Sequence, residues 1–119
     1  MNRSQALNGF AALSQDTRLS IVRLLVRAGP DGIPAGEVAE EVGVSASNVS
    51  FHLKELERAA LIDARREARS ILYSANTGTL RDLIGFLMKD CCGGRPEICA
   101  PVLADPCCVP AKRKRSVHA

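Results

Sequence analysis

The segment from residue 35 to residue 60, AGEVAEEVGVSASNVSFHLKELERAA, most strongly constrains the fold of this chain. Its hydrophobic period predicts a short helix from Ala35 to Val42, and Gly43 follows as a C-terminal stop. After one further residue, Ser45 is placed to cap a second helix. Two amphipathic helices joined by such a short, glycine-containing link are typical of a helix-turn-helix unit.

Hydrophobic periodicity and helix-stopping residues predict five further elements around this unit. Before it come a helix marked by Leu7, Phe10 and Ala11, and a helix capped by Ser14, with Leu19, Val22, Leu25 and Val26 in period and a stop at Gly29 and Pro30. After it come two strands, over residues 61–66 and 70–75, joined by a turn near Glu67 to Arg69. A last helix is predicted from 77 to 90, capped by Asn76 or Thr77. Its apolar residues in helical period are Leu80, Leu83, Ile84, Leu87 and Met88. The predicted fold is mainly α, in the order α-α-α-α-β-β-α.

The composition fits one small domain with an aliphatic core. The chain has 119 residues, of which 46% are apolar, but only three are Phe, one is Tyr and none is Trp. It lacks the long apolar run of a signal peptide and any run of about 18 apolar residues that would span a membrane. We therefore expect a cytoplasmic protein without a membrane partner, folded over residues 1–92, with a flexible, basic, cysteine-rich tail over residues 93–119.

The second helix of a helix-turn-helix unit enters the major groove of DNA. Here a buried stripe of Val49, Leu53 and Leu56 turns the opposite side outward, and hydroxyl, amide and ammonium groups on that side suit phosphates and base edges. The candidate DNA contacts on this helix are Ser47, Asn48, Ser50, Phe51, His52 and Lys54, with Arg58 on the same side. Two have alternatives: Phe51 either touches a thymine methyl or covers a neighbouring loop, and His52 either contacts a phosphate or packs beside the apolar stripe.

Three arginines mark the hairpin as a second candidate contact with DNA. Arg65, Arg66 and Arg69 lie around the predicted tip, where a wing would follow the phosphate backbone. The alternative is a solvated run of charge. The net charge of +3 permits a nucleic-acid partner without requiring one.

The chain resembles the ArsR/SmtB family of winged-helix, metal-responsive repressors. The resemblance rests on LSQDTRLSIVRLL, EVAEEVGVSASNVSFHLKELERAALI and RREARSILYSA, and covers roughly residues 7 to 90. It implies a homodimer formed by the first and last helices, which presents both recognition helices to a palindromic operator in double-stranded DNA.

The sequence departs from the family pattern in three places. The wing turn reads R-E-A-R at residues 66–69, where the family usually has R-E-G-R, so a tight glycine turn is in question. The segment IPAGEV has no cysteine where arsenic-sensing members carry an ELCVCDL-type motif. The last helix also lacks the ligand pairs of the family's zinc sensors.

All five cysteines lie between residues 91 and 108. Thiolates select soft ions, and trivalent arsenic or antimony needs only three sulfurs, whereas zinc needs four ligands. The vicinal pair Cys91 and Cys92 ends the last helix, and Gly93 and Gly94 let the chain return with Cys99 as the third ligand. This triad resembles the subgroup of arsenic repressors with cysteines after the last helix. Less favoured ligands are Cys107 and Cys108.

Other uses of the cysteines remain open. The same thiolates suit cadmium, lead, zinc or methylated trivalent arsenic, and they also suit a redox sensor. Cys107 and Arg113 have the C-x5-R spacing of a phosphate-binding catalytic loop, but Pro110 and the basic end of the chain do not fit a strand-to-helix connection. We therefore predict a repressor without catalytic residues or an organic cofactor, which releases DNA when arsenic(III) or antimony(III) binds.

Overall fold

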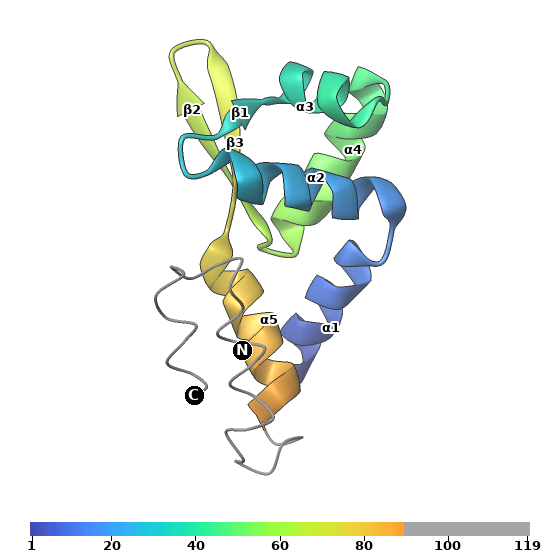
Figure 1. The fold of residues 1–119 in the computed structure, drawn as a ribbon, viewed down its shortest axis with the longest axis vertical. Helices are drawn as coiled ribbons and strands as arrows, with labels where there is room; N and C mark the ends of the chain where they lie inside the picture. Colours follow the sequence, from blue (N-terminus) through green and yellow to red (C-terminus); the bar gives the residue numbers. More distant parts are fainter. Residues whose placement is uncertain (90–119) are drawn as a thin grey trace, which may run out of the picture. The chain divides into compact units, whose positions relative to one another are not determined.

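The computed structural model describes residues 1–89, with the backbone alone described at Lys89. The elements are α1 (Arg3–Leu13), α2 (Asp16–Ala28), β1 (Ile33–Pro34), α3 (Ala35–Val42), α4 (Ala46–Arg58), β2 (Ile62–Glu67), β3 (Ser70–Ala75) and α5 (Thr77–Lys89) (Figure 1). Residues Met1–Leu83 form one compact unit, and the last turns of α5 belong to a second unit that begins at Ile84. The mainly helical fold with a β-hairpin is as predicted.

The sheet has one strand more than the sequence predicted. Its order is β1-β3-β2, and both pairings are antiparallel. The extra strand, β1, has only two residues and includes Pro34, so no alternating pattern could reveal it. It pairs Ile33 with Tyr73. Gly32 just before it has a φ of +79°, which favours glycine, and a Cβ there would lie only 3.0 Å from the Tyr73 carbonyl oxygen.

Caps set the helix ends, and one predicted cap is wrong. Ser45 caps α4 as predicted, since its side chain accepts a bond from the backbone N–H of Asn48 at 3.2 Å. The cap of α2 is Gln15, whose side-chain oxygen accepts from the backbone N–H of Arg18 at 2.8 Å. Ser14 instead ends α1, because its own N–H donates to the Ala11 carbonyl. Asn76 caps α5 by accepting from the N–H of Thr79 at 3.0 Å.

The core is aliphatic, as the composition predicted. Its largest fully buried side chains are Ile21, Leu25, Val38, Val49, Leu53, Leu56, Leu61, Ile62 and Leu83. Helices α2, α3 and α4 pack against one another, and α2 and α4 also pack against the sheet. The helix-turn-helix unit and the hairpin are thus fixed to one core. Among residues 1–89, no helix is long and apolar enough to cross a membrane.

The end of α4 joins the helix-turn-helix unit to the hairpin through a Schellman motif. The backbone N–H of Leu61 donates to the Leu56 carbonyl at 3.0 Å, and that of Ala60 donates to the Glu57 carbonyl at 2.9 Å. This motif needs a left-handed residue, and Ala60 supplies it with a φ of 64°. Leu61 and Leu56 are both fully buried, so the motif's usual apolar contact points into the core.

A candidate DNA-binding surface

Helix α4 carries an exposed polar face opposite a fully buried stripe. Val49, Leu53 and Leu56 are each 1% exposed or less, so they fix which side of the helix faces outward. The exposed side chains include Ser47, Asn48, Ser50, Lys54 and Arg58. Arg58 forms an ion pair with Glu55 at 3.1 Å. The structure therefore places the predicted polar residues on one accessible face; their contact with DNA stays a prediction.

His52 lies beside this face and is held by a residue that the sequence did not single out. Its Nδ1 accepts a hydrogen bond from the Arg18 guanidinium at 3.2 Å, which requires the neutral ring with the proton on Nε2. Arg18 is itself fixed, because its Nε donates to the Ala12 carbonyl at 2.8 Å. Partial burial and then the charge of Arg18 lower the pKa of His52, against an opposing effect of Glu55. This supports the packed interpretation of His52.

Phe51 is the one large apolar side chain on the exposed face of α4, and it is 57% exposed. It lies four residues after Ser47 and three before Lys54, so these three side chains are neighbours on the helix surface. Its ring meets the His52 ring edge to face, with centroids 5.3 Å apart and an angle of 66°. The Phe51 ring therefore contacts His52 on one side and is open to solvent on the other.

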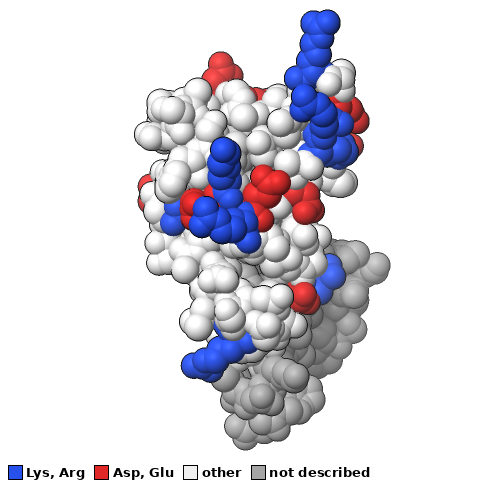
Figure 2. Space-filling model, turned by 180° about the vertical axis from the view of Figure 1, so that it is seen from behind, with Lys and Arg blue, Asp and Glu red and all other residues white. Residues whose placement is uncertain are grey.

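The hairpin closes tightly without the family's glycine. The last pair of the ladder is Glu67 with Ser70, which leaves Ala68 and Arg69 as the turn. Ala68 takes the left-handed conformation, with a φ of 55°, so the turn forms at some cost in backbone strain. Arg66 and Arg69 are exposed, and Figure 2 shows basic side chains projecting at the end of the molecule that the hairpin occupies. This end suits a phosphate backbone.

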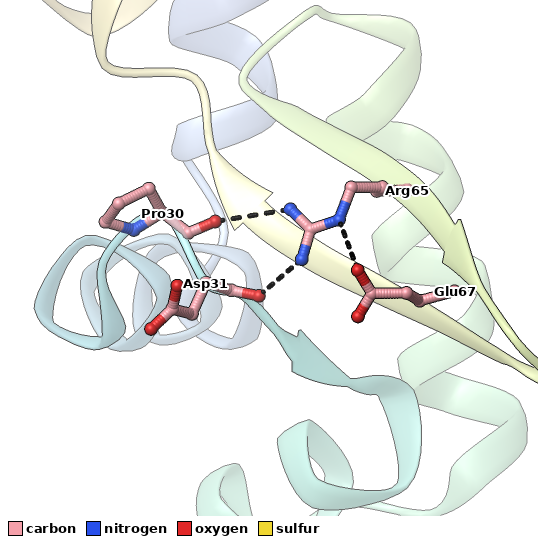
Figure 3. A network of polar contacts seen from close by, with 4 residues as sticks. All are labelled: Pro30, Asp31, Arg65 and Glu67. Atoms are coloured by element: carbon pink, nitrogen blue, oxygen red, sulfur yellow. Dashed lines mark hydrogen bonds and ion pairs between the residues drawn. The ribbon is translucent and has the colours of Figure 1, made fainter.

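Arg65 lies in the middle of β2, opposite Leu72, rather than at the tip. Its guanidinium donates to the carbonyl oxygens of Asp31 at 2.9 Å and Pro30 at 3.4 Å, and it approaches Glu67 at 3.6 Å (Figure 3). These bonds fasten the hairpin to the loop between α2 and β1. A phosphate contact by Arg65, which stays a prediction, would have to compete with them.

The candidate metal ligands lie outside the described residues. Cys91, Cys92 and Cys99, and the less favoured Cys107 and Cys108, all follow residue 89. The predicted domain boundary at residue 92 lies there as well. Within residues 1–89, no group of three or more His, Cys, Asp and Glu side chains could hold a metal ion.

Comparison with known proteins identifies the family. A model described as a helix-turn-helix domain matches residues 13–65, from the end of α1 into β2. The transcriptional repressor SdpR of Bacillus subtilis is 38% identical over 82 residues, which cover 69% of this chain and 88% of SdpR.

Two solved structures extend the comparison to the fold. An ArsR-like transcriptional regulator from Rhodococcus sp. RHA1 is 25% identical with a TM-score of 0.70, over 86% of this chain and 93% of that one. The homodimeric winged helix-turn-helix domain of Mb0332 from Mycobacterium bovis, a possible ArsR-family regulator, is 26% identical with a TM-score of 0.60. This match covers 67% of this chain and 72% of that one. Together with the exposed face of α4 and the wing, these matches show that the chain is a transcriptional regulator, not an enzyme, and belongs to the ArsR/SmtB family of winged-helix proteins.

Proposed function

We propose that this regulator is a homodimeric repressor that binds a palindromic operator and releases it when trivalent arsenic or antimony binds its C-terminal thiolates. One observation carries the proposal: the helix-turn-helix fold occupies residues 1–89 without a single cysteine, and five cysteines follow within residues 91–108. A soft ligand that acts through thiolates must therefore act from the segment after α5.

The geometry of α4 and the hairpin supports the DNA part of the proposal. The exposed side of α4 carries hydroxyl, amide and ammonium groups, which bond to base edges and phosphates. The exposed Arg66 and Arg69 sit where a wing would meet the backbone. Both surfaces belong to the same packed unit, so they can bind one duplex together.

Exposed apolar side chains support the dimer. Leu7 on α1 is 59% exposed, and Ile84 and Leu87 on α5 are 41% and 50% exposed. Exposed apolar side chains are usual where a symmetric partner binds. A dimer also fits the homodimeric relative from Mycobacterium bovis. Light scattering at micromolar concentration should give twice the monomer mass, and a monomer would contradict this part of the proposal.

The ligand is proposed from the chemistry of the thiolates. Trivalent arsenic and antimony are soft and take three sulfurs in a pyramid, so Cys91, Cys92 and Cys99 suffice. Binding would couple to DNA affinity, and couplings between sites are typically about 5- to 150-fold. Because coupling is reciprocal, operator DNA should weaken ion binding by the same factor.

A gel shift with the protein's own promoter tests the proposal. Wild-type protein should bind the fragment and release it with arsenite or antimonite. Cys91→Ser, Cys92→Ser and Cys99→Ser should bind DNA normally but stay bound when arsenite is added. As matched controls from the same segment, Cys107→Ser and Cys108→Ser should retain most of the response. Release of Cys99→Ser at wild-type arsenite concentrations would refute the triad.

The same assay separates the other possible inducers. Parallel lanes contain cadmium, lead, zinc, methylarsenite or the thiol oxidant diamide. Release by one of these, but not by arsenite or antimonite, would replace the proposed ligand while leaving the repressor in place. Failure of the wild-type protein to bind the promoter under any condition would refute the repressor itself.

A further inference from the structure

The outward face of α4 contains one side chain, Phe51, that cannot take part in hydrogen bonding with base edges or phosphates. Ser47, Ser50 and Lys54 are polar, yet Phe51 stands among them with more than half of its surface exposed. By helical geometry, Phe51 points almost directly away from the buried stripe of Val49, Leu53 and Leu56. When α4 lies in the major groove, Phe51 therefore faces the base pairs rather than the backbone.

The support behind the ring is a chain of contacts that begins in another helix. The Ala12 carbonyl fixes Arg18, Arg18 holds His52, and the His52 ring meets the ring of Phe51. A side chain on an exposed helix surface normally loses rotamer freedom when it binds. Here the His52 ring already limits the space that the Phe51 ring can occupy, so less freedom remains to be lost.

The chemical groups that line the major groove indicate what the Phe51 ring contacts. The edges of the four base pairs present hydrogen-bond donors and acceptors there, and one apolar group, the C5 methyl of thymine. A phenyl ring donates no conventional hydrogen bond, and its main gain comes where it removes apolar surface from water. We propose that Phe51 selects thymine at one position of each operator half-site through contact of its ring with the C5 methyl. This proposal rests on the proposed DNA binding by α4.

Uracil-containing DNA provides the test, because deoxyuridine differs from thymidine only by this methyl. The promoter fragment is prepared with either nucleotide, and the Kd of the full-length protein is measured on both. Burial of one methyl is worth about fourfold in affinity, so two half-sites should make the thymine fragment on the order of tenfold tighter. Phe51→Ala should bind both fragments equally, with a Kd near that of wild-type protein on uracil DNA.

Two variants serve as controls. Ser50→Ala, on the same face of α4, should weaken binding but keep the full preference for thymine. Phe51→Leu keeps an apolar side chain and should keep part of the preference. Circular dichroism should show an unchanged fold for Phe51→Ala, since the side chain is exposed and Ala favours helix. Synthetic duplexes with one thymine replaced at a time then locate the contacted position.

The outcomes separate this proposal from the one on which it rests. If wild-type protein binds both fragments equally, or if Phe51→Ala keeps the wild-type preference, the thymine contact is refuted and the repressor stands. A Phe51→Ala protein whose affinity is unchanged on both fragments also refutes the contact, and points to a protein partner for the ring. If wild-type protein binds neither fragment, the proposed repressor function is refuted, and the thymine contact with it.

Discussion

Replacing Ala60 with glycine should stabilise the protein, although it removes a methyl group. Ala60 holds the left-handed position of the Schellman motif that ends α4, with a φ of 64°. This conformation costs an L-residue about 1–2 kcal/mol, and glycine avoids the cost. The side chain is exposed, so its removal loses no core packing.

The expected magnitude follows from two opposing effects. Relief of the left-handed backbone contributes roughly 1–2 kcal/mol, while the greater freedom of glycine in the unfolded chain takes back roughly 0.4–1 kcal/mol. The net increase in the free energy of unfolding is therefore about 0.5–1 kcal/mol. For a domain of this size, that corresponds to a rise in Tm of roughly 2–8 °C.

The neighbouring alanine is the matched control. Ala59 has a φ of −83°, which any residue adopts, so Ala59→Gly should lower the free energy of unfolding by roughly 0.5–1 kcal/mol. Both variants are compared with wild-type protein by thermal and urea unfolding at one protein concentration, because the stability of the proposed dimer would depend on concentration. If Ala60→Gly lowers Tm, or if the two variants shift Tm in the same direction, the strain argument is wrong.

Three further predictions concern the hairpin and His52. Ala68→Gly should raise Tm by a similar few degrees for the same backbone reason, and a fall in Tm would contradict it. Arg66→Ala should reduce the slope of log K against log salt by about two in the proposed dimer. Arg65→Gln should reduce that slope less, because the Asp31 carbonyl competes for its guanidinium, and should lower the free energy of unfolding by about 1 kcal/mol. Because the folded pKa of His52 lies below 6.5, folding disfavours its protonation, so its contribution to stability is full at neutral pH and is lost as pH falls through the folded value. Wild-type protein should therefore lose more stability between about pH 7 and 5 than His52→Gln, measured by urea unfolding; equal losses would refute this.

The helices could be predicted because their signals are local. Ser45 and Gly43 mark the ends of α4 and α3 through caps that involve only nearby backbone. The stripe of Val49, Leu53 and Leu56 has one clear period, and all three are buried. For such segments, the sequence contains both the boundaries and the inward face.

The remaining features depend on contacts between distant residues. The apolar run of α2 predicts a helix, but it hides the inward face: Ile21 is fully buried, while Leu19 and Val26 are 45% and 47% exposed. Neither the bond of Arg18 to His52 nor that of Arg65 to the Asp31 carbonyl has a signal in local spacing, because each joins residues more than thirty positions apart. The tight turn at Ala68 could not be predicted from local sequence either, because alanine disfavours the left-handed backbone that the turn requires. The pairing of β2 with β3 outweighs that preference.

The pairing of β1 with β3 has a consequence for protein engineering. It brings Ile33 beside Tyr73, so α3, α4 and β2 all lie within one closed loop of the chain. Transplanting α4 alone into a relative would separate it from the strand that holds the hairpin in place. A transplant of residues 33–75 would carry α4, the hairpin and the β1–β3 pairing as one block. Exchanges of operator preference between such regulators should therefore succeed at these two boundaries and fail at boundaries inside the loop.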